Sequence, residues 1–133
     1  MLRKDGAHAF PPTYRYVDSY LSTIQRYQTM SIDTLLTSHY PVYSNTGVQE
    51  FLSESRAFVE RMDAAIHHEL ATAASPLTAQ QLIDALAPRM GQWPPAAYPA
   101  FIHPLYGHLE RMVLYGLVET GRRDGLMTFS LTR

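Results

Sequence analysis

The stretch Asp33–Pro41 constrains the fold of this chain most strongly, because a strand pattern, a histidine and a turn follow one another there. Two leucines lie among β-branched threonines, which predicts a strand over 33–38. His39 stands at the end of this strand, and Pro41 then favours a turn. A histidine at that position is well placed to bind a metal ion, although a polar residue that merely ends a strand is the more common case.

The residues before this strand offer it no partner. Residues 1–13 contain one glycine and two prolines with little periodicity, and 16–30 carry apolar residues at helical spacing, which predicts an amphipathic helix. An isolated strand leaves its backbone N–H and C=O groups unpaired. We therefore expect its neighbours to belong to a sheet outside these residues.

A long helix is predicted after the strand, over 47–73, because apolar residues recur there every three or four positions. The residues just before it, 43–47, have the composition of a turn. Thr46 and Gln49 have the spacing of a capping box, which predicts that Thr46 caps the helix. Pro76 lies beyond its expected end.

A second unit begins with the clearest helix start in the sequence. Thr78 and Gln81 have capping-box spacing directly before an apolar run, and Pro88 and Gly91 are expected to stop that helix. Another helical pattern covers 101–113, with prolines that delay or kink its first turns. The unit therefore contains two predicted helices.

The chain ends in a predicted β-hairpin. The segments 117–120 and 126–131 flank a loop that contains Asp124-Gly125, a dipeptide typical of tight hairpin turns. A capped helix, a second helix and a terminal hairpin form a winged-helix arrangement. We thus expect a mostly helical α+β chain with two units, 1–74 and 75–133.

The order helix, strand, histidine, turn and helix resembles the C-terminal part of the metallo-β-lactamase-fold hydrolases. In that family the last metal-binding histidine lies in a Gly-His-Gly-Pro-like turn, and here the turn reads Ser38-His39-Tyr40-Pro41, so both glycines are replaced. Residues 11–21 also look like the lead-in to the preceding helix. The resemblance covers roughly 7–70, and one branch of the family carries a winged helix after its catalytic domain.

The resemblance implies that the chain is the end of an αββα hydrolase domain followed by a winged-helix appendage. His39 would then be one ligand of the second metal, expected to be zinc, and Tyr40 would be a candidate to line the substrate pocket. The family's main metal motif, His-x-His-x-Asp-His, does not occur in this sequence. We therefore expect an upstream catalytic domain as partner, and this chain alone to be inactive and to bind zinc weakly or not at all.

The composition argues against some partners. A formal net charge of −1 and a pI of about 6.6 provide no excess of positive charge for nucleic acid or an anionic membrane. The sequence has no cysteine, and no apolar run approaches membrane-spanning length. We expect a soluble, cytoplasmic protein.

An alternative from another class is a free-standing winged-helix module that binds DNA or another protein. In a DNA-binding winged helix the second helix would present Arg111 to the bases, but Glu110 lies beside it. The hairpin would offer Arg122 and Arg123 to the phosphates. Charged residues at a hairpin tip are more often simply solvated. We therefore favour a packing or dimerisation role, with a second copy of the chain as a candidate partner in a homodimer, over nucleic-acid binding.

The other histidines are weaker metal candidates. His67 and His68 are adjacent and point to different parts of a helix surface, and His103 and His108 are five residues apart, which does not suit one helical face. The sequence alone assigns them no site.

Overall fold

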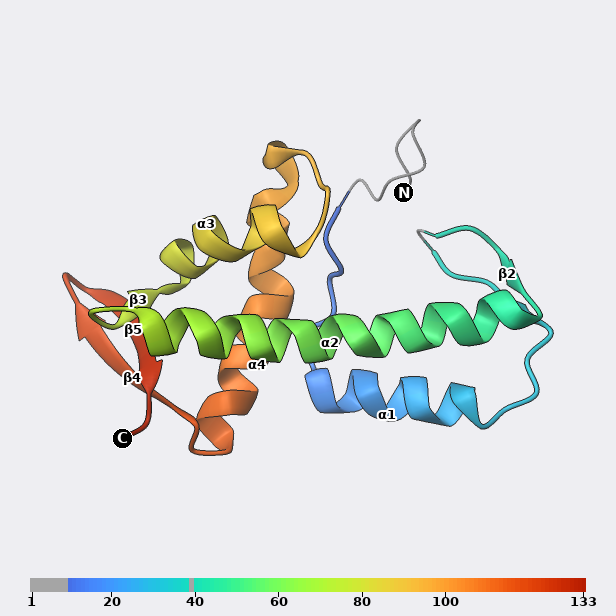
Figure 1. The fold of residues 1–133 in the computed structure, drawn as a ribbon, viewed down its shortest axis with the longest axis horizontal. Helices are drawn as coiled ribbons and strands as arrows, with labels where there is room; N and C mark the ends of the chain where they lie inside the picture. Colours follow the sequence, from blue (N-terminus) through green and yellow to red (C-terminus); the bar gives the residue numbers. More distant parts are fainter. Residues whose placement is uncertain (1–9, 39) are drawn as a thin grey trace.

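A long helix, α2 (Thr46–Thr72), forms the axis on which the other elements are assembled (Figure 1). The computed structural model describes residues 10–38 and 40–133. The described chain is mostly helical, with two small antiparallel sheets, as expected for the α+β class. The remaining elements are α1 (Val17–Gln28), β1 (Thr34–Leu35), β2 (Tyr43–Ser44), β3 (Leu77–Thr78), α3 (Ala79–Met90), the 3-10 helix η1 (Pro95–Phe101), α4 (Ile102–Leu114), β4 (Val118–Arg123) and β5 (Leu126–Leu131).

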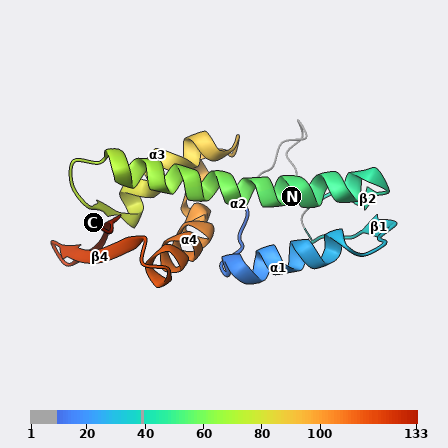
Figure 2. The ribbon, with the colours of Figure 1, turned by 60° about the horizontal axis from the view of Figure 1, so that its bottom comes forward.

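The second half of α2 packs against α3, α4 and the C-terminal sheet, as Figures 1 and 2 show from two sides. This packing buries most of the apolar side chains of the molecule, because each element presents an apolar face to the same centre. We call this group the large cluster: Phe58, Met62, Ile66, Leu70, Leu82, Ile83, Leu86, Ala87, Trp93, Ala97, Phe101, Leu105, Leu109, Met112, Val118 and Phe129.

The first half of α2 packs against α1 and the β1–β2 ladder. A group of three buried apolar side chains, Ile24, Val48 and Leu52, lies there, and we call them the small cluster. Partly buried aromatic side chains surround it, among them Tyr20, Tyr43 and Phe51. The two halves of one helix therefore serve two apolar clusters of very different size.

The segment before α1 crosses directly over α4. A Cβ atom at Gly107 would lie 2.0 Å from the carbonyl oxygen of Arg15, so only glycine permits this approach of the two backbones. Arg15 also donates a hydrogen bond to Glu110 at 2.5 Å. This crossing brings the start of the described chain onto its C-terminal half.

The predicted C-terminal hairpin is confirmed. β4 and β5 pair over six residues, and Asp124 and Gly125 adopt the positive φ angles, 53° and 79°, that a tight hairpin turn needs. β3 pairs with the other edge of β5, which makes a three-stranded sheet in the order β3-β5-β4. Phe129 projects from this sheet into the large cluster.

The two predicted capping boxes have opposite outcomes. Thr78 accepts a hydrogen bond from the backbone N–H of Gln81, whose side chain accepts one from Thr78, so that box is confirmed. The box at Thr46 is wrong, because the N-cap of α2 is Asn45 with φ 53° and makes no side-chain capping bond. β2 leads directly into α2 at this point, and asparagine adopts a positive φ angle more readily than most residues.

The strand expected over 33–38 is shorter and has a partner within this chain. β1 contains only Thr34 and Leu35, which pair with Ser44 and Tyr43 of β2, in the segment predicted as a turn. The partner follows the strand in the chain, no described residue before the strand pairs with it, and a further sheet beside β1 stays a prediction. A short ladder with the next segment satisfies its backbone groups locally.

The prolines of the second unit act less sharply than predicted. Pro88 lies inside α3, which continues to Met90, because a missing N–H near the last turn costs only one hydrogen bond. The predicted delay of the following helix is confirmed, since Pro95–Phe101 forms a 3-10 turn before α4 begins. None of the helices in the described ranges is long and apolar enough to cross a membrane.

Candidate functional site

A half-open pocket of about 540 Å³ lies along one face of α2, where the two halves of the molecule meet. On α2, residues that line the pocket recur at helical spacing over about three turns. The opposite walls come from four other segments. The lining residues are Phe10, Pro12, Tyr20, Tyr40, Tyr43, Glu50, Phe51, Glu54, Ser55, Phe58, Arg61, Met90, Gly91, Gln92 and Trp93. Pockets of this size accommodate small organic ligands.

Aromatic rings form much of the pocket wall. Tyr43 stacks on Phe51 with ring centroids 4.5 Å apart, and Tyr40 packs against the same ring at 5.3 Å. At the other end Phe58 meets Trp93 edge to face at 6.3 Å. Tyr40, the predicted pocket residue, therefore lines a real cavity, while its role toward a substrate stays a prediction.

The tyrosines of the wall are held in their neutral form. Burial raises the pKa of Tyr20, against a smaller lowering by its hydrogen bond with Ser55. Burial likewise raises the pKa values of Tyr40 and Tyr43. These hydroxyls consequently act as neutral polar groups rather than as phenolates.

The charged groups of the pocket all lie on α2. Arg61 donates a hydrogen bond to Glu54 at 2.6 Å, and its guanidinium lies 5.8 Å from the centre of the Phe58 ring. Glu50 lies one turn before Glu54 and makes no ion pair with any described residue. The lining therefore carries two carboxylates and one guanidinium.

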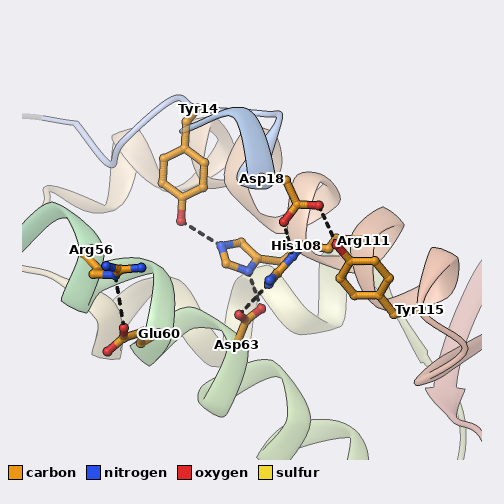
Figure 3. Close-up of polar contacts among 8 residues, drawn as sticks. All are labelled: Tyr14, Asp18, Arg56, Glu60, Asp63, His108, Arg111 and Tyr115. Carbon is orange, nitrogen blue, oxygen red and sulfur yellow. Dashed lines mark hydrogen bonds and ion pairs between the residues drawn. The ribbon is translucent and has the colours of Figure 1, made fainter. Parts of the chain in front are cut away.

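A buried polar network lies next to this pocket and joins three segments of the chain (Figure 3). His108 of α4 is fully buried, with Nδ1 2.6 Å from Asp63 Oδ1 and Nε2 2.7 Å from the hydroxyl of Tyr14. Because an ionised carboxylate can only accept, Nδ1 carries a proton and donates to Asp63. Both imidazole nitrogens are thus satisfied, as a buried histidine requires.

Arg111 extends the network to α1. Its Nη1 donates to Asp63 Oδ2 at 2.9 Å and its Nε donates to Asp18 Oδ1 at 2.8 Å, while the hydroxyl of Tyr115 donates to Asp18 Oδ2 at 2.8 Å. Burial alone would raise the pKa of Asp63, but His108 and Arg111 outweigh it and lower that pKa below its ordinary value. Burial would lower the pKa of Arg111, but Asp63 and Asp18 raise it.

The network has the connectivity of a catalytic triad but not its chemistry. Burial, followed by electrostatic interactions with Tyr20 and with the Asp63 carboxylate, raises the pKa of Tyr14, so its hydroxyl is a poor nucleophile at neutral pH. Tyr14 also stacks on Tyr20 with centroids 4.5 Å apart. We interpret the network as a structural clamp that fastens the segment before α1 to α2 and α4.

This clamp is not predicted from the sequence. Its members are far apart in the sequence: His108 is 94 residues from Tyr14 and 45 residues from Asp63. One signal was available: His108 falls at helical spacing with Leu105, Leu109 and Met112, which are all buried. A histidine on that apolar face must find buried partners.

The arginines considered for nucleic-acid contact are placed differently from one another. Arg111 is engaged by Asp18 and Asp63 inside the clamp. Arg123 donates to Ser75 Oγ at 3.4 Å and to Gln81 Oε1 at 3.2 Å, which ties the hairpin to the start of α3. Arg122 is exposed on β4, opposite Met127. The three do not form one basic surface.

The predicted metal ligand, His39, lies outside the described residues. Over 10–38 and 40–133, no three or more histidine, aspartate and glutamate side chains gather in a way that could hold a metal ion. Zinc therefore finds no ligand set among the residues that the structure describes. His39 as a ligand stays a prediction.

Comparison with known proteins finds solved structures with a similar fold. The chain matches part of a solved protein described as a beta-lactamase domain protein from Burkholderia ambifaria, with a TM-score of 0.69 and 21% sequence identity. The match covers 87% of this chain and 33% of that one, so the chain spans about a third of the neighbour's length. No protein-family model matches the sequence, and no curated protein does. The likeness thus concerns the fold.

Proposed function

We propose that this chain is the C-terminal part of a metallo-β-lactamase-fold hydrolase, in which it shapes the mouth of the active site and is inactive alone. The observation that carries the proposal is the fold match over 87% of the chain to a third of a beta-lactamase domain protein. The order of α1, the short strands β1 and β2 and the long helix α2 in the first half supports the proposal.

We further propose that 75–133 is a winged-helix appendage that packs on a neighbouring domain or a second copy of the chain. The order β3, α3, α4 and a terminal hairpin supports this assignment. Leu114 and Leu117, exposed by 77% and 55% at the end of α4, favour an apolar contact. The engagement of Arg111 by two carboxylates weakens the alternative of DNA binding.

In this proposal His39 is the contribution of the chain to a metal site whose other ligands come from an upstream domain. The described residues do not fit a zinc site by themselves. The pocket beside Tyr40 would then open toward the site, because Tyr40 follows His39 directly in the sequence. Zinc would bind weakly or not at all to the isolated chain, since one histidine cannot hold the ion.

The size of the native polypeptide is the first test. An antibody raised against this chain should detect, in an extract of the source cells, a protein about three times as long, as the one-third coverage of the neighbour suggests. A native band at 15.1 kDa would contradict the proposal. It would favour the free-standing binding module instead.

A second test uses the intact longer protein. His39→Ala should sharply reduce both hydrolase activity and the occupancy of one metal, measured by elemental analysis, because a ligand is lost. His67→Ala, an exposed histidine on α2, is the matched control and should change neither. Unchanged metal stoichiometry in His39→Ala would remove His39 from the site.

A further inference from the structure

One end of the pocket already holds a cation against an aromatic wall. The guanidinium of Arg61 lies 5.8 Å from the centre of the Phe58 ring, and Glu54 accepts its hydrogen bond at 2.6 Å. A cation over a ring face is attracted by the negative face of the π system. Carboxylate, cation and ring together form a neutral unit at this end.

The other end repeats two of these three parts. Glu50 lies one helical turn before Glu54, and Phe51 stands beside it with Tyr43 and Tyr40 packed on its ring. Among the described lining residues the only cationic side chain is Arg61, which Glu54 already engages. Among the described lining residues, this end therefore offers a carboxylate beside an aromatic stack, with no cation between them.

The charge and size of the pocket select the kind of ligand. Two carboxylates and one guanidinium leave one net negative charge among aromatic and aliphatic walls. The neutral tyrosines add no further negative charge, because burial raises their pKa values. A volume of about 540 Å³ admits a molecule of drug-like or metabolite size but not a folded protein.

We infer that the pocket binds a small organic cation, with an alkylated ammonium group between Glu50 and the rings of Tyr43 and Phe51 and an apolar body toward Phe58 and Trp93. Quaternary ammonium groups suit such a site because they are weakly hydrated and large enough to contact several ring faces. The assignment of this ligand as a substrate rests on the proposed hydrolase function. The binding itself requires only this chain.

Trp93 provides a direct readout, because it lines the pocket and is the single tryptophan of the sequence. The full chain is titrated with (4-hydroxyphenyl)trimethylammonium and, separately, with its neutral isostere 4-tert-butylphenol. Tryptophan emission is recorded and the affinities are checked by calorimetry. The cation should bind at least about threefold more tightly than the isostere. Equal affinities, or no binding of the cation at millimolar concentration, would overturn the inference.

Two variants on the same helix assign the charge effect. Glu50→Gln should weaken binding of the cation about three- to tenfold and leave the isostere unaffected. Glu60→Gln is the matched control, because Glu60 pairs with Arg56 and lies outside the pocket lining. An unchanged affinity in Glu50→Gln, with native circular dichroism, would contradict the inference. Neither result depends on the length of the native polypeptide. A negative result would therefore contradict the cation-binding inference without affecting the hydrolase proposal.

Discussion

The two ends of α2 are packed in different ways. At its C-terminal end the large cluster surrounds the helix with α3, α4 and the sheet, and Met62 and Ile66 have no exposed surface. At its N-terminal end only Val48 and Leu52 of the helix are buried, against Ile24 of α1. Beyond them lie aromatic rings, an open pocket and short strands.

The two ends should therefore contribute differently to stability. Burial of apolar surface is the main source of folding free energy, and it is concentrated in the large cluster. The lightly packed end supplies one side of the pocket, and Phe58 and Trp93 of the large cluster line its other side. The clamp around His108 joins the two, since it connects α1 to α2 and α4. The variants below test this division.

Matched leucines should show the largest difference. Leu82→Ala in the large cluster should lower the free energy of unfolding by about 4 kcal/mol, because a rigid surround cannot close the cavity. Leu52→Ala in the small cluster should cost about 2 kcal/mol, since its neighbours can relax toward solvent. Chemical denaturation measures both values. A larger loss in Leu52→Ala would mean that the small cluster, not the large one, dominates stability.

Two helical glycines should respond in opposite directions. Gly107→Ala should destabilise the fold by about 2 kcal/mol, because its Cβ would meet the backbone oxygen of Arg15 at 2.0 Å. Gly47→Ala meets only Tyr43 at 3.9 Å and should stabilise α2 by up to about 1 kcal/mol. Thermal denaturation of both variants provides the comparison. Stabilisation by Gly107→Ala would rule out the close crossing of α4.

Because of the clamp, the stability of the fold should decrease at acid pH. The folded-state pKa of Asp63 is lowered from its ordinary value of 3.8, so its contribution is complete above that value and is lost as pH falls through the folded pKa. Asp63→Asn should cost about 1–3 kcal/mol at neutral pH. The difference in unfolding free energy between this variant and the unmodified chain should become smaller below about pH 4. A difference that does not change with pH would exclude this role of the carboxylate.

The two threonines with capping-box spacing should show the smallest effects. Thr78→Ala removes an observed cap and should cost about 1 kcal/mol. Thr46→Ala should change stability by less than about 0.5 kcal/mol, because Thr46 lies inside α2 and Asn45 occupies the N-cap. An equal loss of stability in the two variants would mean that Thr46 caps α2 after all, which contradicts the structure.

Local chemistry explains which sequence predictions are confirmed. The helices, the Thr78 cap and the Asp124-Gly125 turn depend on residues a few positions apart, so their patterns are readable without the fold. The cap at Thr46 has the same local pattern and fails, because the β1–β2 ladder positions the chain before α2. Tertiary context overrides a local preference there.

The candidate site could be anticipated only in part. Tyr40 is predicted to line a pocket and does line one, whereas no sequence pattern assigns Glu50 and Glu54 to it. A carboxylate at helical spacing has the same pattern whether it faces solvent or a cavity. What lies opposite that face decides between the two.

The sequence by itself determined the helical content, the hairpin and the second capped helix, because these follow from short-range hydrogen bonding and apolar periodicity. Only the tertiary structure decided which distant side chains meet. Tyr14, Asp63 and His108 come together because the segment before α1 crosses α4 at Gly107. That crossing depends on the packing of the whole chain, since side chains far apart in sequence carry no local pattern of their contact.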